Sequence, residues 1–240
     1  LAAIERAERF IYMENQFFIG NRVHRLRDET VASTNRVIEA IVNKIIEKIN
    51  KGEDFHFYCQ LPFRPEGKPD AIDVRVILRK QWRTMEWVIK VVDQAARQHG
   101  KTAQDYLTFY NVGRGAADAY QMKYTHSKLM IVDDREIILG SANCNERSMA
   151  GNRDSEAAIQ MIGYDMEIAN YRERLLCEHF GEEFVNANAK LLMQYPERQE
   201  SHDLLQRHLD ENLHRLAAAK SPIATPWGNQ TNEQLMRRVR

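Results

Sequence analysis

The sequence predicts an α/β fold in which a mixed β-sheet carries helices on both faces. Three observations lead to this prediction. Short apolar runs of strand length are interspersed with long amphipathic segments of helical period. The runs at 123–132 and 136–139 are joined by Asp133-Asp134-Arg135, a turn sequence that predicts an antiparallel pair. The 240 residues suffice for one sizeable α/β domain or for half of a larger one.

The individual elements follow from their residue patterns. Alternating apolar and polar residues predict strands, and a one-sided apolar stripe predicts a helix. Strands are expected at 10–14, 55–61, 106–112, 123–132, 136–139 and 157–162. Helices are expected at 1–9, 34–50, 79–98, 166–181, 183–193 and 201–220. The stretch 113–122, with two glycines and small residues, is expected to form a loop that borders a cleft.

Composition and domain layout narrow the class of protein. Residues 1–200 are predicted to form one domain, and 201–240 a C-terminal helix and tail. The 34 basic residues equal the 34 acidic ones, which argues against a dedicated nucleic-acid binder. The 3 cysteines are too few and too scattered for a zinc site or a disulfide framework. No run is long and apolar enough to span a bilayer.

The chemistry concentrates between residues 124 and 156. His126 and Lys128 are two residues apart on a predicted strand, so both are expected on the same face. The next strand leads into a small polar loop that contains Asn143. Histidine can attack phosphorus or protonate a leaving oxygen near neutral pH. Lysine supplies a positive charge and asparagine supplies N–H donors, so together these groups suit phosphoryl chemistry.

The complete spacing is His126-x-Lys128-x4-Asp133-x6-Gly140-Ser141-x-Asn143. It resembles the HKD signature of the phospholipase D superfamily, with every defining position filled. Further similar segments occur in that family's order: FIYMENQFFIG, LPFRPEGKPD, ILRKQWRTMEWV, DYLTFYNVG and NERSMAGNRDSE. The resemblance covers about residues 10 to 165. It implies the C-terminal catalytic half of a eukaryote-type phospholipase D, and therefore one half of the pseudo-twofold phospholipase D fold.

This resemblance implies catalytic roles for His126, Lys128, Asn143 and Glu156. Glu156 precedes the strand at 157–162 and is expected beside His126. There its carboxylate would accept a hydrogen bond from one ring nitrogen and fix the tautomer, as a triad carboxylate does.

The remaining motif residues are expected to be structural. Asp133 lies at the turn, away from the histidine, and Gly140 and Ser141 shape the loop that follows. Outside the motif, the first strand closes on polar residues, and the resemblance places that end near the catalytic cleft. Gln16 is expected to contact the phosphate or the headgroup, and Glu14 to contribute more weakly.

The resemblance also implies the reaction. Glycerophospholipids of the phosphatidylcholine or phosphatidylethanolamine type would be cleaved to phosphatidic acid and free headgroup through a phosphohistidine. Transfer of the phosphatidyl group to an alcohol is the companion reaction. No metal or other cofactor is expected, because Lys128, Asn143 and their counterparts would neutralise the phosphate. The expected partner is a phospholipid membrane surface, contacted peripherally, and no nucleic acid is expected.

The family's active site contains two HKD motifs, whereas this chain contains one. The resemblance makes His126 the general acid and base and leaves the attacking histidine on the other motif. That motif would come from the N-terminal half of a longer protein or from a second copy in a homodimer. The start on Leu1 and the match to second-half segments favour the longer protein.

Three other functions compete with that of a phospholipase half-domain: an HKD nuclease, a phosphatidyltransferase and a non-catalytic lipid-binding half-domain. The balanced charge argues against the nuclease, and the lack of an apolar span argues against a membrane-embedded lipid synthase. The intact motif, with Glu156, argues against a non-catalytic module. The sequence assigns no compartment, and a secreted bacterial effector remains one of the options.

Overall fold

The structure is a computed structural model that describes residues 1–20, 35–68, 70–116 and 119–218. In chain order its elements are α1 (Ala2–Arg6), β1 (Phe10–Asn15), α2 (Val37–Lys51), β2 (His56–Gln60), α3 (Ile72–Arg97), the 3-10 turn η2 (Ala103–Asp105), β3 (Leu107–Tyr110), β4 (Gly113–Ala116), β5 (Ala119–Met122), β6 (Lys128–Val132), β7 (Glu136–Gly140), α4 (Glu146–Met149), β8 (Ala158–Ile162), α5 (Asp165–Phe180), α6 (Glu182–Ala187), the π-helical turn η3 (Lys190–Gln194) and α7 (Gln199–Ala218).

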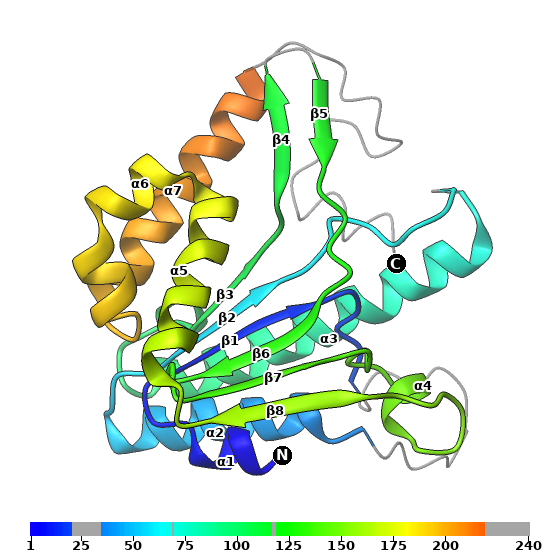
Figure 1. Cartoon of the computed structure of the whole chain (residues 1–240), viewed down its shortest axis with the longest axis horizontal. Coiled ribbons are helices and arrows are strands. Elements are labelled where there is room, and N and C mark those ends of the chain that lie inside the picture. Colours follow the sequence, from blue (N-terminus) through cyan, green and yellow to red (C-terminus); the bar gives the residue numbers. More distant parts are fainter. Residues whose placement is uncertain (21–34, 69, 117–118, 219–240) are drawn as a thin grey trace.

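The main sheet is mixed, as the sequence predicts. Its 6 strands lie in the order β3-β2-β1-β6-β7-β8 (Figure 1). The strands β1, β2 and β3 run parallel, while β6 pairs antiparallel with both β1 and β7, and β8 pairs antiparallel with β7. The C-terminal ends of β1 and β2 and the start of β6 therefore lie at the same end of the sheet. Side chains from these three strands come together there.

Helices cover both faces of this sheet, which confirms the predicted fold class. On one face α1, α2 and α3 pack over strand residues such as Ile11 and Phe57. On the other face α5, α6 and α7 pack over the intervening residues, among them Phe10 and Tyr58 (Figure 1). Neighbouring residues of one strand enter opposite cores because side chains alternate across a strand. These strands are buried on both sides, and their sequences are accordingly almost continuously apolar.

Several predicted elements differ from the structure. The helix expected at 183–193 is divided into α6 (Glu182–Ala187) and the π-helical turn η3 (Lys190–Gln194). Helix α3 begins at Ile72 rather than at residue 79, because its buried stripe already includes Val74 and Leu78. Residues 113–122 contain the hairpin strands β4 and β5 rather than only loop, and neither strand has the apolar alternation that would have predicted it. Strand β6 begins at Lys128 rather than at residue 123, because its partner β1 ends at Asn15, directly opposite Lys128.

The C-terminal helix packs on the face that carries α5 and α6. Ser201, His202 and Leu205, in the first turns of α7, are buried. The boundary expected at residue 200 thus falls at the start of α7, and the tail from 219 onward lies outside the described residues. None of the helices in the described ranges has the length and apolar character that crossing a bilayer requires.

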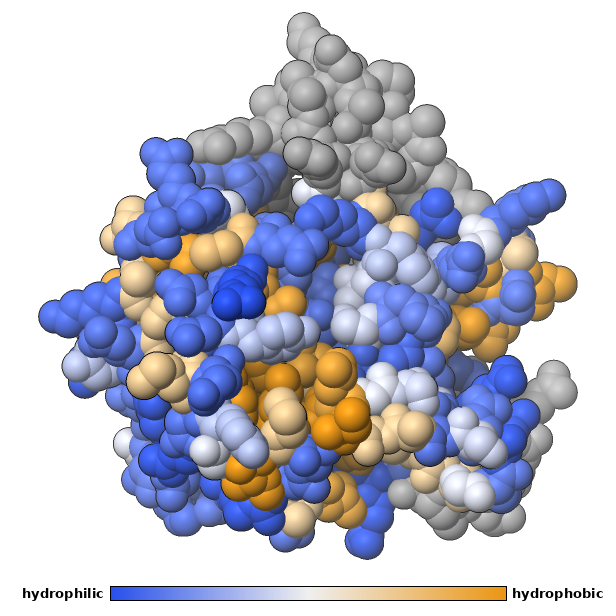
Figure 2. All heavy atoms as spheres, viewed as in Figure 1, coloured by the Kyte–Doolittle hydropathy of each residue, from blue (hydrophilic) through white to orange (hydrophobic). Residues whose placement is uncertain are grey.

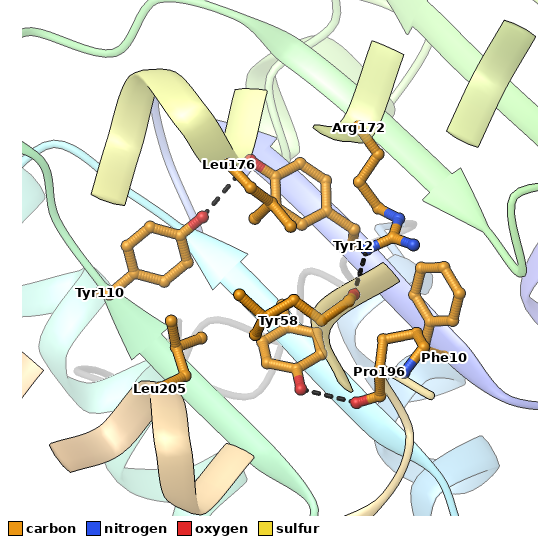
Figure 3. A pocket seen from close by; sticks show the side chains of 9 residues that line it. Phe10, Tyr12, Tyr58, Tyr110, Arg172, Leu176, Pro196 and Leu205 are labelled. Atoms are coloured by element: carbon orange, nitrogen blue, oxygen red, sulfur yellow. Dashed lines mark hydrogen bonds between the residues drawn. The ribbon is translucent and has the colours of Figure 1, made fainter. Parts of the chain in front are cut away.

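The core under α5 contains one small cavity (Figure 3). Its wall is tied together by Tyr58, whose hydroxyl donates to the Pro196 carbonyl at 2.7 Å, and by Tyr110, whose hydroxyl donates to that of Tyr12 at 3.3 Å. The cavity measures about 20 Å³ and its walls are mainly apolar. That is room for about one water molecule. This cavity is therefore a packing defect of the core and not a ligand site.

Candidate active site

Polar side chains converge where β1 ends and β6 begins. The Gln16 Oε1 atom accepts hydrogen bonds from Lys128 Nζ at 3.0 Å and from Asn143 Nδ2 at 3.1 Å. The Gln16 Nε2 atom donates to the Tyr124 hydroxyl at 2.8 Å. The structure thus brings together three residues that the sequence singled out, and it adds Tyr124, which the sequence reasoning missed.

The loop that carries Asn143 is held from both sides by the segment that follows β1. The Cys144 amide donates to Asn15 Oδ1 at 3.1 Å, and the Ile19 amide donates to the Cys144 carbonyl at 2.8 Å. Phe18 and Cys144 form an isolated parallel bridge beside these contacts. Asn143 is therefore placed by backbone hydrogen bonds on its immediate neighbour, which gives its amide a fixed direction.

Gly140, the last residue of β7, and Ser141 after it lie against the start of β8. A Cβ atom on Gly140 would lie 2.5 Å from the Ala157 carbonyl oxygen, so only glycine fits at this position. The Ser141 amide donates to that carbonyl at 2.9 Å, and the Ser141 hydroxyl donates to the Glu156 carboxylate. These bonds keep the loop against β8.

Glu156 makes a different contact from the one expected. Its carboxylate bonds to Ser141, and among the described residues no hydrogen bond joins it to His126. The cause is the strand pairing, which sets the start of β8 against Gly140 and brings Glu156 to the neighbouring serine. Hydrogen bonds from the hydroxyls of Ser141 and then Ser148 lower the pKa of Glu156, so it carries its negative charge at neutral pH.

His126 and Lys128 have unlike surroundings. His126 lies in the extended segment before β6, is exposed, and has its ring centroid 6.4 Å from that of Tyr124. Lys128 is buried and donates to two neutral oxygens, Gln16 Oε1 and the His126 carbonyl. Burial lowers the pKa of Lys128, against a smaller opposing effect of the Glu156 charge. A partly dehydrated ammonium with neutral partners is well prepared to receive an anion.

Asp133 lies at the far end of β6, as the sequence indicated. Its carboxylate accepts hydrogen bonds from the backbone amides of Glu8 at 2.7 Å, Arg9 at 2.8 Å and Phe10 at 2.8 Å. The residue itself adopts a left-handed conformation with φ of 56°, which aspartate tolerates in tight turns. Asp133 therefore anchors the start of β1 to the β6–β7 turn.

Glu14 is buried beside a cavity that opens next to His126. One carboxylate oxygen accepts from the Tyr12 hydroxyl at 2.6 Å and the other from the Ser127 hydroxyl at 2.6 Å. The cavity has a volume of about 190 Å³, and its wall also includes Gln60 and His179.

Sequence reasoning assigned neither Gln60 nor His179 to the site. A signal existed for Gln60, which closes an apolar strand parallel to β1, much as Gln16 follows β1 itself. No pattern in the sequence could have placed His179, because it comes from α5, more than fifty residues after the motif histidine. In the described part of the chain, no group of three or more His, Cys, Asp or Glu side chains is arranged to hold a metal ion.

The chain is similar in sequence to known proteins of one family. The family model described as "Phospholipase D" matches residues 1–123 and 116–219. Phospholipase D alpha 1 of Brassica oleracea var. capitata is 39% identical over an alignment of 200 residues that covers 71% of this chain and 24% of that protein. Phospholipase D alpha 2 of Arabidopsis thaliana is 37% identical over 220 residues, covering 75% of this chain and 27% of that protein. This chain thus spans about a quarter of the length of these relatives.

Two solved structures are similar to this chain at low sequence identity. Nuc from Salmonella typhimurium, described as a phospholipase D family member, superposes with a TM-score of 0.40 at 14% identity, covering 72% of this chain and 79% of the other. A phosphatidylserine synthase from Haemophilus influenzae gives the same TM-score of 0.40 at 14% identity, and the match covers 91% of this chain and 42% of the other.

Proposed function

This chain belongs to the phospholipase D family, and we propose that it supplies one of two catalytic halves of an enzyme that hydrolyses glycerophospholipids. The products are phosphatidic acid and the free headgroup, with transfer to an alcohol as the companion reaction. The observation that carries this proposal is the convergence of Lys128 and Asn143 on a single oxygen of Gln16, with His126 beside it. Two donors aimed at one oxygen form a ready cradle for a phosphate oxygen.

Each polar group has a distinct task in the proposed site. The phosphodiester replaces Gln16 as the acceptor for Lys128 and Asn143, whose donors then stabilise the charge that builds on the phosphate oxygens. No metal ion is needed for this task, since Lys128 brings a positive charge that burial has already dehydrated. Gln16 is released to hydrogen-bond elsewhere on the substrate, while its other end stays on Tyr124.

His126 transfers protons in both steps of the proposed reaction. First, a histidine of the second half attacks phosphorus, the bond from phosphorus to the headgroup oxygen breaks, and His126 gives that oxygen its proton. Second, a water molecule attacks the phosphohistidine and gives a proton to His126 as the phosphorus–nitrogen bond breaks. Phosphatidic acid leaves, and both histidines return to their starting forms. The exposed position of His126 beside a cavity gives it access to both oxygens.

The second half of the enzyme needs a surface to pack on, and the sheet offers one. Leu139 and Ile159 are cross-strand partners on β7 and β8, on the same sheet face as Ile137 and Met161. Ile137 is buried on the α5 side, whereas Leu139, Ile159 and Met161 are exposed. We call the three exposed side chains, Leu139, Ile159 and Met161, the β8 patch. Figure 2 shows apolar side chains gathered over β6 to β8 on this face.

The β8 patch supports pairing with a second half. Large contiguous apolar surfaces on soluble domains mark interaction sites, and β8 is also an edge strand of the sheet. Leu139 immediately precedes Gly140, so the patch begins at the loop that holds Asn143. A half that packs here lies next to the site it has to complete. We propose the N-terminal half of the same protein as this partner, with a second copy of the chain as the other arrangement.

The test is headgroup release from phosphatidylcholine and phosphatidylethanolamine vesicles, with the solution mass recorded on the same sample. The chain alone is expected to be monomeric and inactive, and addition of an N-terminal half is expected to produce activity that His126→Ala removes. Activity from a dimer of this chain would show instead that two copies of one motif build the site. Absence of phospholipid hydrolysis with every partner, in the presence of correctly folded protein, would overturn the proposed function.

The β8 patch has its own matched test. Ile159→Lys places a charge in the middle of the patch, whereas Ile89→Lys places one on an exposed position of α3 on the opposite face of the sheet. Each variant is mixed with the N-terminal half, and assembly is measured by sedimentation. Assembly is expected to fail for Ile159→Lys and to persist for Ile89→Lys. Equal assembly by both variants would remove the patch from the interface.

A further inference from the structure

The first turns of α3 carry an outward face that the catalytic site does not use. These turns extend past the ends of β1 and β2, at the end of the sheet where the polar side chains of the site converge (Figure 1). Residues three or four positions apart share one face of a helix. We give the name α3 tip to six side chains on the face opposite the buried stripe of Val74 and Leu78: Ile72, Arg75, Val76, Arg79, Lys80 and Arg83.

Two apolar side chains of the α3 tip are in contact with water. Ile72 is 80% exposed, and Val76, one turn later, is 44% exposed. A single exposed apolar residue is ordinary. Two of them on one face, surrounded by cations, give the composition of a helix that lies in a membrane interface.

The four cations of the α3 tip have no acidic partner. Between residues 74 and 85 the chain has four basic residues and no acidic one. Among the described residues, none of these four side chains forms an ion pair or a hydrogen bond. Arg97, at the other end of α3, is instead paired with Asp93. Cations at the start of a helix also oppose the helix dipole, so local stability does not account for this cluster.

The inner face of the same turns is bonded to the catalytic segment. Gln81 Oε1 accepts a hydrogen bond from the Phe18 amide at 3.2 Å, and Thr84 Oγ1 accepts one from the Gly20 amide at 3.1 Å. Phe18 and Gly20 belong to the segment that follows Gln16. A partner that binds the α3 tip is therefore held in a fixed position relative to Gln16.

The loop before α3 makes a second connection to the site. The Tyr124 hydroxyl, which accepts a hydrogen bond from Gln16, also accepts one from the Glu66 amide at 3.2 Å. The next residue, Gly67, packs so closely on α3 that a Cβ atom there would lie 2.9 Å from Val74 Cγ2. The start of α3 thus lies beside the residues that would cradle the phosphate.

The chemistry of the α3 tip fits an anionic bilayer. Lipid phosphates attract basic side chains, and the boundary between headgroups and acyl chains accepts apolar ones. A nucleic acid or an acidic protein loop would pair the cations but offers no apolar layer for Ile72 and Val76. The proposed substrate is itself part of a bilayer, so the site has to be brought to such a surface.

We propose that the α3 tip docks this half-enzyme on an anionic lipid bilayer. Ile72 and Val76 enter the boundary below the headgroups, and the four cations contact lipid phosphates. The proposal rests on the function proposed above and identifies the surface through which that site reaches its substrate. Phosphatidic acid, a product of the proposed reaction, is anionic, so its accumulation strengthens the docking.

The first test measures sedimentation of the full chain with phosphatidylcholine vesicles, either pure or containing about one quarter phosphatidic acid. Wild type is expected to bind the mixed vesicles more tightly, and added salt is expected to weaken this binding. Arg75→Gln combined with Arg83→Gln is expected to weaken binding to the mixed vesicles roughly twentyfold, about fivefold for each charge removed. Lys90→Gln combined with Arg97→Gln removes as much charge from the far end of α3 and is expected to bind like wild type. Equal binding by both double variants would overturn the proposal.

Ile72→Ser tests the apolar part of the docking surface. It is expected to weaken binding to both kinds of vesicle about tenfold, because an apolar side chain no longer enters the bilayer boundary. Ile89→Ser, at a position of α3 that is 41% exposed, is the matched control and is expected to bind like wild type. Unchanged binding by Ile72→Ser would overturn the insertion of the α3 tip.

A further measurement uses the unaltered chain, so it does not depend on whether the variants fold. Hydrogen exchange of peptides that cover 72–83 is expected to slow when mixed vesicles are added. Peptides that cover 89–97 are expected to exchange as before. Protection of other surfaces, with none at 72–83, would overturn the proposal.

Hydrolysis separates this proposal from the function on which it rests. The assembled enzyme, in which this chain is joined to its second half, is compared with its Arg75→Gln and Arg83→Gln double variant. The variant is expected to lose activity on mixed vesicles and to keep it on a short-chain phosphatidylcholine dissolved as monomers.

Three outcomes would decide against one proposal or the other. Equal activity of variant and wild type on vesicles would overturn the docking surface and leave the phospholipase function standing. Hydrolysis of neither substrate by wild type, with vesicle binding as expected, would overturn the function and keep the docking surface. Failure of the double variant to assemble with the second half would place the α3 tip in the interface between the halves and overturn its docking on lipid.

Discussion

At the turn between β6 and β7, the Asp133 carboxylate accepts hydrogen bonds from three backbone amides. The Asp134 carboxylate accepts two hydrogen bonds from the Arg172 guanidinium, at 2.6 and 2.7 Å. At the other end of the same two strands, Lys128 is buried against neutral oxygens, and Asn143 leaves its Oδ1 atom without a partner among the described residues. Both ends bury charged or polar groups. The two ends differ in whether other residues of the protein supply the hydrogen-bond and ion-pair partners of these buried groups.

This difference separates stability from function within one sheet. Arg172 uses its remaining donors on the carbonyls of Leu192 and Met193, at 2.9 and 3.0 Å, so the turn end ties α5 to η3. A fully paired network specifies one arrangement and leaves nothing for a ligand. At the junction of β1 and β6, by contrast, hydrogen-bond donors and acceptors remain available to a ligand. This arrangement lowers the stability of the fold but suits the binding of a phosphate and a headgroup. Removing a side chain should therefore have opposite consequences at the two ends.

The largest expected effect is on catalysis. His126→Ala should reduce phospholipid hydrolysis by the assembled enzyme about 10²- to 10⁴-fold, because it removes a general acid and base. Stability should be unchanged, since the His126 ring is exposed. Headgroup release and urea unfolding on the same preparation measure both quantities. Full activity in the variant would remove His126 from the chemistry and favour a non-catalytic role for this half.

The second effect concerns the paired end. Arg172→Leu should lower the free energy of unfolding by about 3–5 kcal/mol, because Asp134 is left without its cation. Arg135→Leu is the matched control: its ion pair with Glu8 is exposed, and its loss should amount to less than about 1 kcal/mol. Urea unfolding distinguishes the two. Similar values for both variants would mean that the turn end does not carry the stability assigned to it.

The third prediction applies the same kind of substitution to the unpaired end. Lys128→Met should reduce hydrolysis about 10²- to 10³-fold, as expected for the loss of a donor to the transition state. Its free energy of unfolding should stay equal or rise, because burial of this ammonium is not offset by a bonded carboxylate. Lys90→Met, on an exposed position of α3, is the control. A marked loss of stability in Lys128→Met alone would erase the contrast between the two ends.

Sequence reasoning reached the fold class and the motif residues because their signals are local. Alternation along 10–14 and 136–139, and the fixed spacing from His126 to Asn143, can be read within a few residues. The strand start at Lys128 could not be read this way, since it depends on where β1 ends. The same holds for Glu156, whose hydrogen-bond partner is decided by the pairing of β7 with β8.

The cavity beside His126 was the least accessible part of the site. Its wall combines the ends of two parallel strands with α5, and these segments are far apart in the sequence. A helical histidine such as His179 looks the same in sequence whether it faces solvent or a buried carboxylate. The ends of parallel strands are nevertheless a general place to look, and applying that rule to Gln60 would have found one member of the wall.

The smallest expected effect tests the contact between α7 and β2 through pH. His56, at the start of β2, stacks on His202 of α7 with ring centroids 4.3 Å apart and bonds to Thr108 at 2.9 Å. Burial lowers the pKa of His56, and the facing His202 lowers it further; burial likewise lowers the pKa of His202. The unfolded chain therefore binds more protons once the pH falls below about 6.5, the ordinary histidine pKa.

The contribution of this histidine pair to the free energy of unfolding should thus be fully present above that pH and decline below it, by up to about 1 kcal/mol for each histidine between pH 6.5 and pH 5.5. His202→Phe keeps the stacked ring and removes one titrating group, so its unfolding free energy should depend less on pH. His99→Phe, at an exposed position after α3, should retain the original dependence. Urea unfolding at pH 7.5 and pH 5.5 measures how the unfolding free energy of each variant depends on pH. If His202→Phe keeps the full dependence, the contact between α7 and β2 is not where acid weakens the fold, and the carboxylates of the turn end become the groups to examine.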